Sequence, residues 1–98
     1  MDYRIILSPS ARRDLRNIIH YISLDSRIAA ERFAVFLSSR TQILKKHPEI
    51  GRVFPEVGDV RIREIIVKSY RVIYEINSLK KQIEIHHYWH AARGTPEI

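Results

Sequence analysis

Residues 60–89 read VRIREIIVKSYRVIYEINSLKKQIEIHHYW, and most of the predicted sheet lies in this stretch. It contains three runs rich in β-branched and aromatic residues, which are Val60 to Val67, Tyr70 to Ile76 and Gln82 to Trp89. Only Lys68-Ser69 and Asn77 to Lys81 separate these runs. Because connections this short join antiparallel neighbours, the stretch predicts three antiparallel strands in chain order.

The N-terminal part predicts a strand followed by a helix. Asp2 to Leu7 contains Ile-Ile-Leu and stops at Ser8-Pro9, which breaks a strand. Ser8 is a good N-cap, and Pro9 suits the first turn of a helix. The apolar residues that follow recur at helical spacing and form one stripe: Ala11, Leu15, Ile18, Ile19 and Ile22.

A second helix is predicted from the cap at Ser26 to the basic residues before Pro48, because apolar residues keep helical spacing throughout. Pro48 to Asp59 reads as a crossing loop, since it contains Gly51, Pro55 and Gly58. The order strand, helix, helix, strand, strand, strand predicts an α+β fold. We expect one domain over residues 1–98, with an N-terminal helix hairpin packed on one face of a small antiparallel sheet.

The composition limits the cellular compartment and the kinds of binding partner that we expect. The chain has no cysteine, no apolar run long enough for a membrane span and no leader-like start, so we expect a cytoplasmic protein without membrane contact. Its 17 Lys and Arg against 11 Asp and Glu give a formal charge of +6. Such a charge attracts polyanions or an acidic protein partner.

Strand alternation predicts a polar face on the sheet, because residues two apart share a face. Cations, groups that titrate near neutral pH and an aromatic ring on one face are what metal-free RNA cleavage needs. The alternative is a solvated face held by cross-strand pairs. The predicted face carries Arg61, Arg63, Arg71, Glu75, Glu84, His86, Tyr88 and His90.

Three histidines near the C-terminus suggest a metal site, but their spacing argues against one. On a strand His86 and His90 lie about 13 Å apart, and His87 points to the other face. We therefore expect that these histidines share no zinc ion. The sequence shows no phosphate-binding glycine loop, nucleophile elbow or paired-carboxylate motif, and we expect no cofactor.

Five stretches, in this order and spacing, resemble the RelE/ParE toxin superfamily. The Gly-Arg, Phe-Pro-Glu and His-to-Arg elements are closer to its ParE branch. The stretches are Ser8 to Leu15, Ala29 to Phe33, Pro48 to Arg52 with Phe54-Pro55-Glu56, Arg63-Glu64 with Tyr70 to Tyr74, and His90-Ala91-Ala92-Arg93.

The resemblance implies the toxin of a type II toxin–antitoxin module, of the kind that stabilises plasmids. An acidic antitoxin, partly disordered before it binds, would neutralise it and form a higher oligomer with it. The basic charge, the helix hairpin and an exposed fourth strand or sheet edge would suit such a partner.

Two targets are implied by the resemblance. RelE-like members cut mRNA on the ribosome, whereas characterised ParE-like members poison DNA gyrase. Arg71 and Arg93 match positions of the ribonuclease branch, and Tyr88 or His90 would have to move the proton. We predict a gyrase inhibitor, with a metal-independent endoribonuclease and a non-toxic binding module as alternatives. The candidate target-binding residues are Arg61, Arg63, Arg71, His86 and Arg93.

Overall fold

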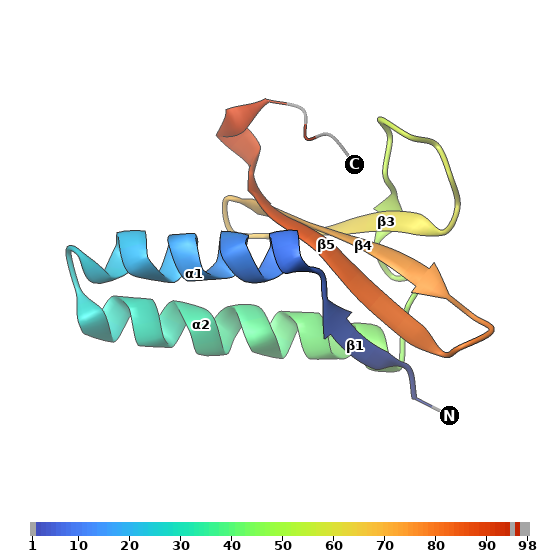
Figure 1. The fold of residues 1–98 in the computed structure, drawn as a ribbon, viewed down its shortest axis with the longest axis horizontal. Helices are drawn as coiled ribbons and strands as arrows, with labels where there is room; N and C mark the ends of the chain where they lie inside the picture. Colours follow the sequence, from blue (N-terminus) through green and yellow to red (C-terminus); the bar gives the residue numbers. More distant parts are fainter. Residues whose placement is uncertain (1, 95, 97–98) are drawn as a thin grey trace.

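The computed structural model describes residues 2–94 and 96, which form a helix pair packed on a five-stranded sheet (Figure 1). The α+β class and the position of the helix pair on one face of the sheet are as predicted. The helices are α1 (Pro9–Ser23) and α2 (Arg27–Gln42), and the 3-10 turn η1 (Ile43–Lys45) continues α2. The strands are β1 (Arg4–Leu7), β2 (Arg52–Val53), β3 (Ile62–Val67), β4 (Tyr70–Asn77) and β5 (Gln82–His90), and the turn η2 (Ala91–Arg93) follows β5.

Both helices begin where their caps predict. The Ser8 hydroxyl accepts a hydrogen bond from the Ala11 N–H at 3.0 Å, and Pro9 occupies the first turn. The Ser26 hydroxyl accepts one from the Ala29 N–H at 3.1 Å. Each cap satisfies an N–H that has no partner within its helix. None of the helices in the described part of the chain is both long and apolar enough to cross a membrane.

The sheet has the order β1-β5-β4-β3-β2 and is mixed rather than wholly antiparallel. The pairs β3–β4 and β4–β5 are antiparallel, as their short turns predict. β1 instead runs parallel to β5. Parallel pairing needs a long connection between the strands, and both helices and three strands lie between β1 and β5. β2 is a short strand inside the predicted loop.

One edge of the sheet is β1, and at the other edge part of β3 is open, which fits the predicted sheet edge; the fourth predicted strand is not an edge. That strand, β5, lies between β1 and β4. Beyond the end of β1, the Asp14 carboxylate of α1 accepts the Tyr88 backbone N–H at 3.1 Å and so covers the β5 edge. β2 pairs only with Arg63 and Glu64, so within the described residues Ile65–Val67 of β3 have a strand partner on one side only.

A bulge in β5 reverses the predicted faces of its last residues. Tyr74 is paired with Ile85 and Ile73 with His87, so the register passes over His86. One extra residue moves every later side chain to the opposite face. Tyr88 therefore joins the core beneath the helices, with 5% of its surface exposed, although alternation predicted it on the polar face.

Candidate functional site

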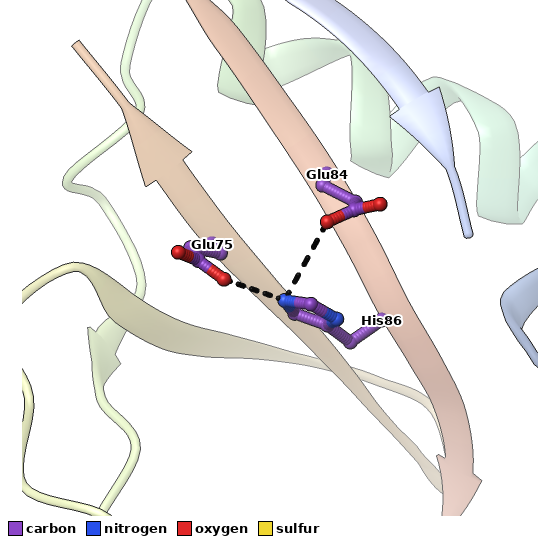
Figure 2. A group of neighbouring side chains, drawn as sticks. All are labelled: Glu75, Glu84 and His86. Atoms are coloured by element: carbon purple, nitrogen blue, oxygen red, sulfur yellow. Dashed lines mark hydrogen bonds and ion pairs between the residues drawn. The ribbon is translucent and has the colours of Figure 1, made fainter. Parts of the chain in front are cut away.

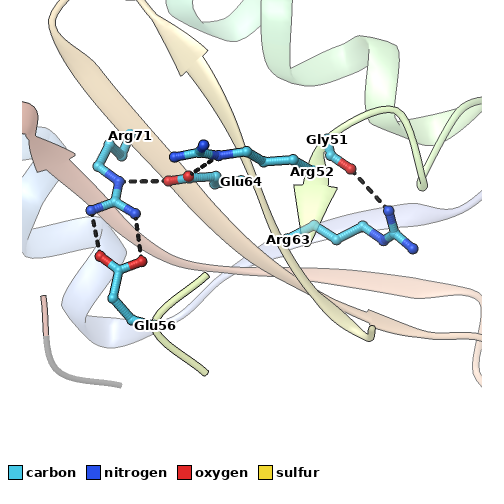
Figure 3. Close-up of polar contacts among 6 residues, drawn as sticks. All are labelled: Gly51, Arg52, Glu56, Arg63, Glu64 and Arg71. Carbon is cyan, nitrogen blue, oxygen red and sulfur yellow. Dashed lines mark hydrogen bonds and ion pairs between the residues drawn. The ribbon is translucent and has the colours of Figure 1, made fainter. Parts of the chain in front are cut away.

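The face of the sheet that points away from the helices, here called the open face, has an arginine–carboxylate network at its centre (Figure 3). Arg71 on β4 donates from Nε to Glu64 Oε1 at 2.6 Å. Its two terminal nitrogens donate to the two Glu56 oxygens at 2.8 and 2.9 Å. Arg52 on β2 donates from Nε to the other Glu64 oxygen at 2.5 Å.

This network neutralises the charge of Arg71, the arginine on β4 that matches a position of the ribonuclease branch. The Glu64 side chain is fully buried and that of Arg71 is 12% exposed. The bonds to Glu56 and Glu64 raise the pKa of Arg71, and the hydrogen bond from Arg71 lowers the pKa of Glu56. The guanidinium also lies 4.9 Å from the centre of the Phe54 ring. Arg71 is therefore held on three sides, with its charge balanced by two carboxylates.

Arg61 and Arg63 do not join this network, because they stabilise the loop that leads into β3. Arg61 donates to both oxygens of the Asp59 carboxylate, at 3.2 and 2.8 Å. Arg63 donates to the backbone carbonyls of Val60 and Gly51, each at 3.0 Å. Figure 3 shows the bond to Gly51. The register pairs Arg63 with Tyr74, which faces the helices. The prediction that Arg63 shares a face with Arg71 is therefore wrong.

A second polar group lies on the helix side of the sheet, around a pocket of about 340 Å³ between α1 and the end of β5. The pocket brings together three of the four residues predicted for RNA cleavage, and Arg71 is not among its lining residues. Those residues are Asp14, Asn17, Ile18, Tyr21, Tyr70, Tyr88, His90 and Arg93.

The chemistry of this pocket is limited at neutral pH. Burial raises the pKa of the Tyr88 hydroxyl to about 12, which makes it a poor general base. His90 Nδ1 accepts the Ala92 N–H at 3.1 Å, so this nitrogen is occupied by the cap of η2. The Arg93 guanidinium lies 4.1 Å from the centre of the Trp89 ring. Nε2 is thus the ring nitrogen of His90 that this cap leaves unoccupied.

The three C-terminal histidines have three different environments. His86 lies on the open face, with Nε2 2.9 Å from Glu75 Oε1 and 3.9 Å from Glu84 Oε1. His87 Nδ1 lies 3.0 Å from Asp14 Oδ2 at the covered edge of β5. His90 packs edge-on against Tyr70, with ring centres 5.2 Å apart. The register pairs His87 with Ile73 on the open face and His90 with Tyr70 on the helix side, so the bulge leaves His86 and His87 on one face and His90 on the other. The prediction that His87 points away from the face of His86 is therefore wrong.

Of the eight residues predicted to share a polar face, four do. The open face carries Arg71, Glu75, Glu84 and His86, whereas the bulge moves Tyr88 and His90, the register moves Arg63, and Arg61 precedes β3. Sequence reasoning missed Arg52, Glu56 and Asp14 as partners. The signal for the network was Glu64, because a lone carboxylate within an apolar strand requires a buried partner.

Comparison with known proteins identifies the family of the chain and solved structures with a similar fold. The family model for the ParE toxin of the type II toxin–antitoxin system parDE matches residues 5–94. The structure is similar to a chromosomal ParDE system from P. aeruginosa, with a TM-score of 0.72 and 16% identity over 90% of this chain and 95% of that one. It is also similar to the RelBE2 toxin–antitoxin complex from Mycobacterium tuberculosis, with a TM-score of 0.60 and 21% identity over 92% and 99%. No curated protein sequence matches the chain.

Proposed function

The chain belongs to the ParE toxin family of type II toxin–antitoxin systems, and from this membership we propose that it inhibits growth by binding DNA gyrase until an antitoxin neutralises it. The observation that carries the choice of target is the pairing of Arg71 with Glu56 and Glu64. RNA cleavage without a metal needs a cation free to approach the scissile phosphate. An arginine that already balances two carboxylates is poorly suited to that task.

The positions of the other candidates support the same choice. Tyr88, His90 and Arg93 line the pocket on the helix side, whereas Arg71 lies on the open face. A general acid, a general base and a charge stabiliser must surround one phosphate in order to cleave it. We therefore interpret Arg71 as a structural residue. Among the predicted target-binding residues, Arg61 and Arg93 have exposed side chains, and we propose these two as contacts to the target.

We propose that the antitoxin binds beside the free edge of β3. A groove of about 380 Å³ runs along this edge and is lined by the exposed Ile43, Ile50 and Ile66 and by Arg40 and Arg52. An extended segment can pair with an open strand edge through its backbone. The apolar and basic lining suits a segment that alternates apolar and acidic residues. Toxin–antitoxin complexes among the similar structures support a partner of this kind.

The test of the target compares two activities of the purified, untagged toxin. We expect inhibition of gyrase supercoiling and no cleavage of mRNA on ribosomes. Arg93→Ala should weaken gyrase inhibition, while Tyr88→Phe, which keeps the ring and removes the hydroxyl, serves as the matched control. Codon-phased cuts that disappear in His90→Ala would establish the ribonuclease instead, because His90 Nε2 is the available proton donor in the pocket. No growth defect on induction would favour the non-toxic binding module.

The antitoxin proposal has its own test. We expect the product of the neighbouring gene to co-purify with the toxin and to restore growth. Ile66→Asp on the rim of the groove should prevent both, because it places a carboxylate against an acidic, apolar segment. Val57→Asp, at an exposed position that is not among the residues lining the groove, should leave both unchanged. Equal effects of the two variants would exclude the β3 edge as the binding site.

A further inference from the structure

We propose that Glu75, Glu84 and His86 form a binding site for a divalent transition-metal ion of the zinc type on the open face. The three side chains converge from β4 and β5 (Figure 2). One ligand atom from each lies within 4.8 Å of the other two. This site is separate from the arginine–carboxylate network and from the pocket beside α1.

The strand register creates a concentration of negative charge at this point. Glu75 and Glu84 are directly opposite each other in the antiparallel β4–β5 pair. Like charges in directly opposed positions destabilise a sheet. A cation bound between them would remove the repulsion.

The bulge supplies the third ligand. Because the register passes over His86, its ring is not committed to a cross-strand pair and leans toward the two carboxylates (Figure 2). Nε2 lies 2.9 Å from Glu75 Oε1 and 3.9 Å from Glu84 Oε1. Ligands at about 2.0–2.1 Å from a tetrahedral ion are about 3.4 Å apart, so the two distances bracket the required value. Small side-chain rotations would complete the geometry.

The donor set selects the class of ion. One imidazole nitrogen and two carboxylate oxygens suit zinc and its neighbours, whereas magnesium and calcium prefer sites made of oxygen ligands. Three protein ligands leave a fourth position for water or for a group of another molecule. The side chains of His86, Glu75 and Glu84 are 22%, 38% and 42% exposed, so an ion can enter from solvent.

The ordinary alternative is a protonated His86 that bridges the two carboxylates without any metal. Glu84→Gln distinguishes the two readings, because it removes the like-charge contact as well as a metal ligand. If the site binds zinc, this variant is at least as stable as the parent protein without metal, and it loses the stabilisation that zinc adds. A purely structural bridge would show no zinc-dependent stabilisation in either protein.

The experiment is titration of the metal-free, untagged, full-length protein with Zn²⁺ at pH 7.5, by calorimetry and by thermal unfolding. We expect one ion per chain and a rise in melting temperature with Zn²⁺ but not with Mg²⁺. His86→Gln and Glu84→Gln should each weaken binding at least about tenfold. His20→Gln, at an exposed position on α1, is the matched control and should bind like the parent.

Three results would overturn the proposal. The first is the absence of saturable one-to-one binding in the parent protein. The second is unchanged binding in both His86→Gln and Glu84→Gln, with circular dichroism showing that the variants are folded. Loss of binding in His87→Gln alone would likewise place the ion at the Asp14 edge and reject the site proposed here.

Discussion

Replacement of Arg71 by alanine tests whether the arginine–carboxylate network stabilises the fold. The change removes three hydrogen bonds to carboxylates, two of them to Glu56 and one to the fully buried Glu64. Loss of one partner from a buried ion pair costs about 3–5 kcal/mol, because a charge stays buried without compensation. Arg52 still pairs with Glu64, so we expect the low end, about 3 kcal/mol.

The assay is reversible unfolding by urea or by heat, monitored by circular dichroism. For a chain of this size about 3 kcal/mol corresponds to a fall of about 12–24 °C in melting temperature. Arg71→Lys keeps the charge, but a single ammonium lacks the planar fork that serves both carboxylates, so its loss should be intermediate. If the alanine variant does not fold, the lysine variant still tests the network.

Arg61→Ala is the matched control. Arg61 also makes a two-oxygen contact, with Asp59, but its side chain is 67% exposed. Exposed ion pairs contribute little to stability. If Arg71→Ala destabilises the protein no more than Arg61→Ala, the network is not structural. Arg71 would then be free to bind a phosphate, and its pairing would no longer favour gyrase as the target.

Three further predictions concern other parts of the fold. Tyr74→Phe should cost about 1–3 kcal/mol in urea unfolding, because the hydroxyl accepts the Gly51 N–H at 3.1 Å and donates to the Pro48 carbonyl at 2.6 Å; Tyr21→Phe, at a ring 74% exposed, should cost almost nothing. Unfolding free energy should fall in acid: Arg71 lowers the pKa of Glu56 from its ordinary 4.5, so the stabilisation is complete above pH 4.5 and lost as the pH falls through the lowered value. Glu56→Gln should flatten that slope, and an unchanged slope would contradict the pairing. Asp14→Ala should uncover the β5 edge and speed amide exchange there, with Asp25→Ala as a control in the turn between the helices.

Local signals were enough to predict most of the fold. Ser8 and Ser26 begin the helices through hydrogen bonds to N–H groups three residues away. The turns at Lys68 and at Lys81 connect strands that are adjacent in the sheet, and both residues adopt positive φ. Such features depend on a few neighbouring residues. The parallel pairing of β1 with β5 could not be predicted in this way, because β5 lies about 80 residues further along the chain.

The site was harder to predict because it depends on register, which alternation alone cannot supply. Alternation placed Tyr88 and His90 with Arg71 on one face, but the bulge at His86 divides this set between two faces. A single inserted residue thus changes a possible catalytic group into two separate groups. The same residue, freed from cross-strand pairing, completes the cluster with Glu75 and Glu84. Removing the bulge should therefore affect both features together, since the faces of β5 and the position of the His86 ring have one structural cause.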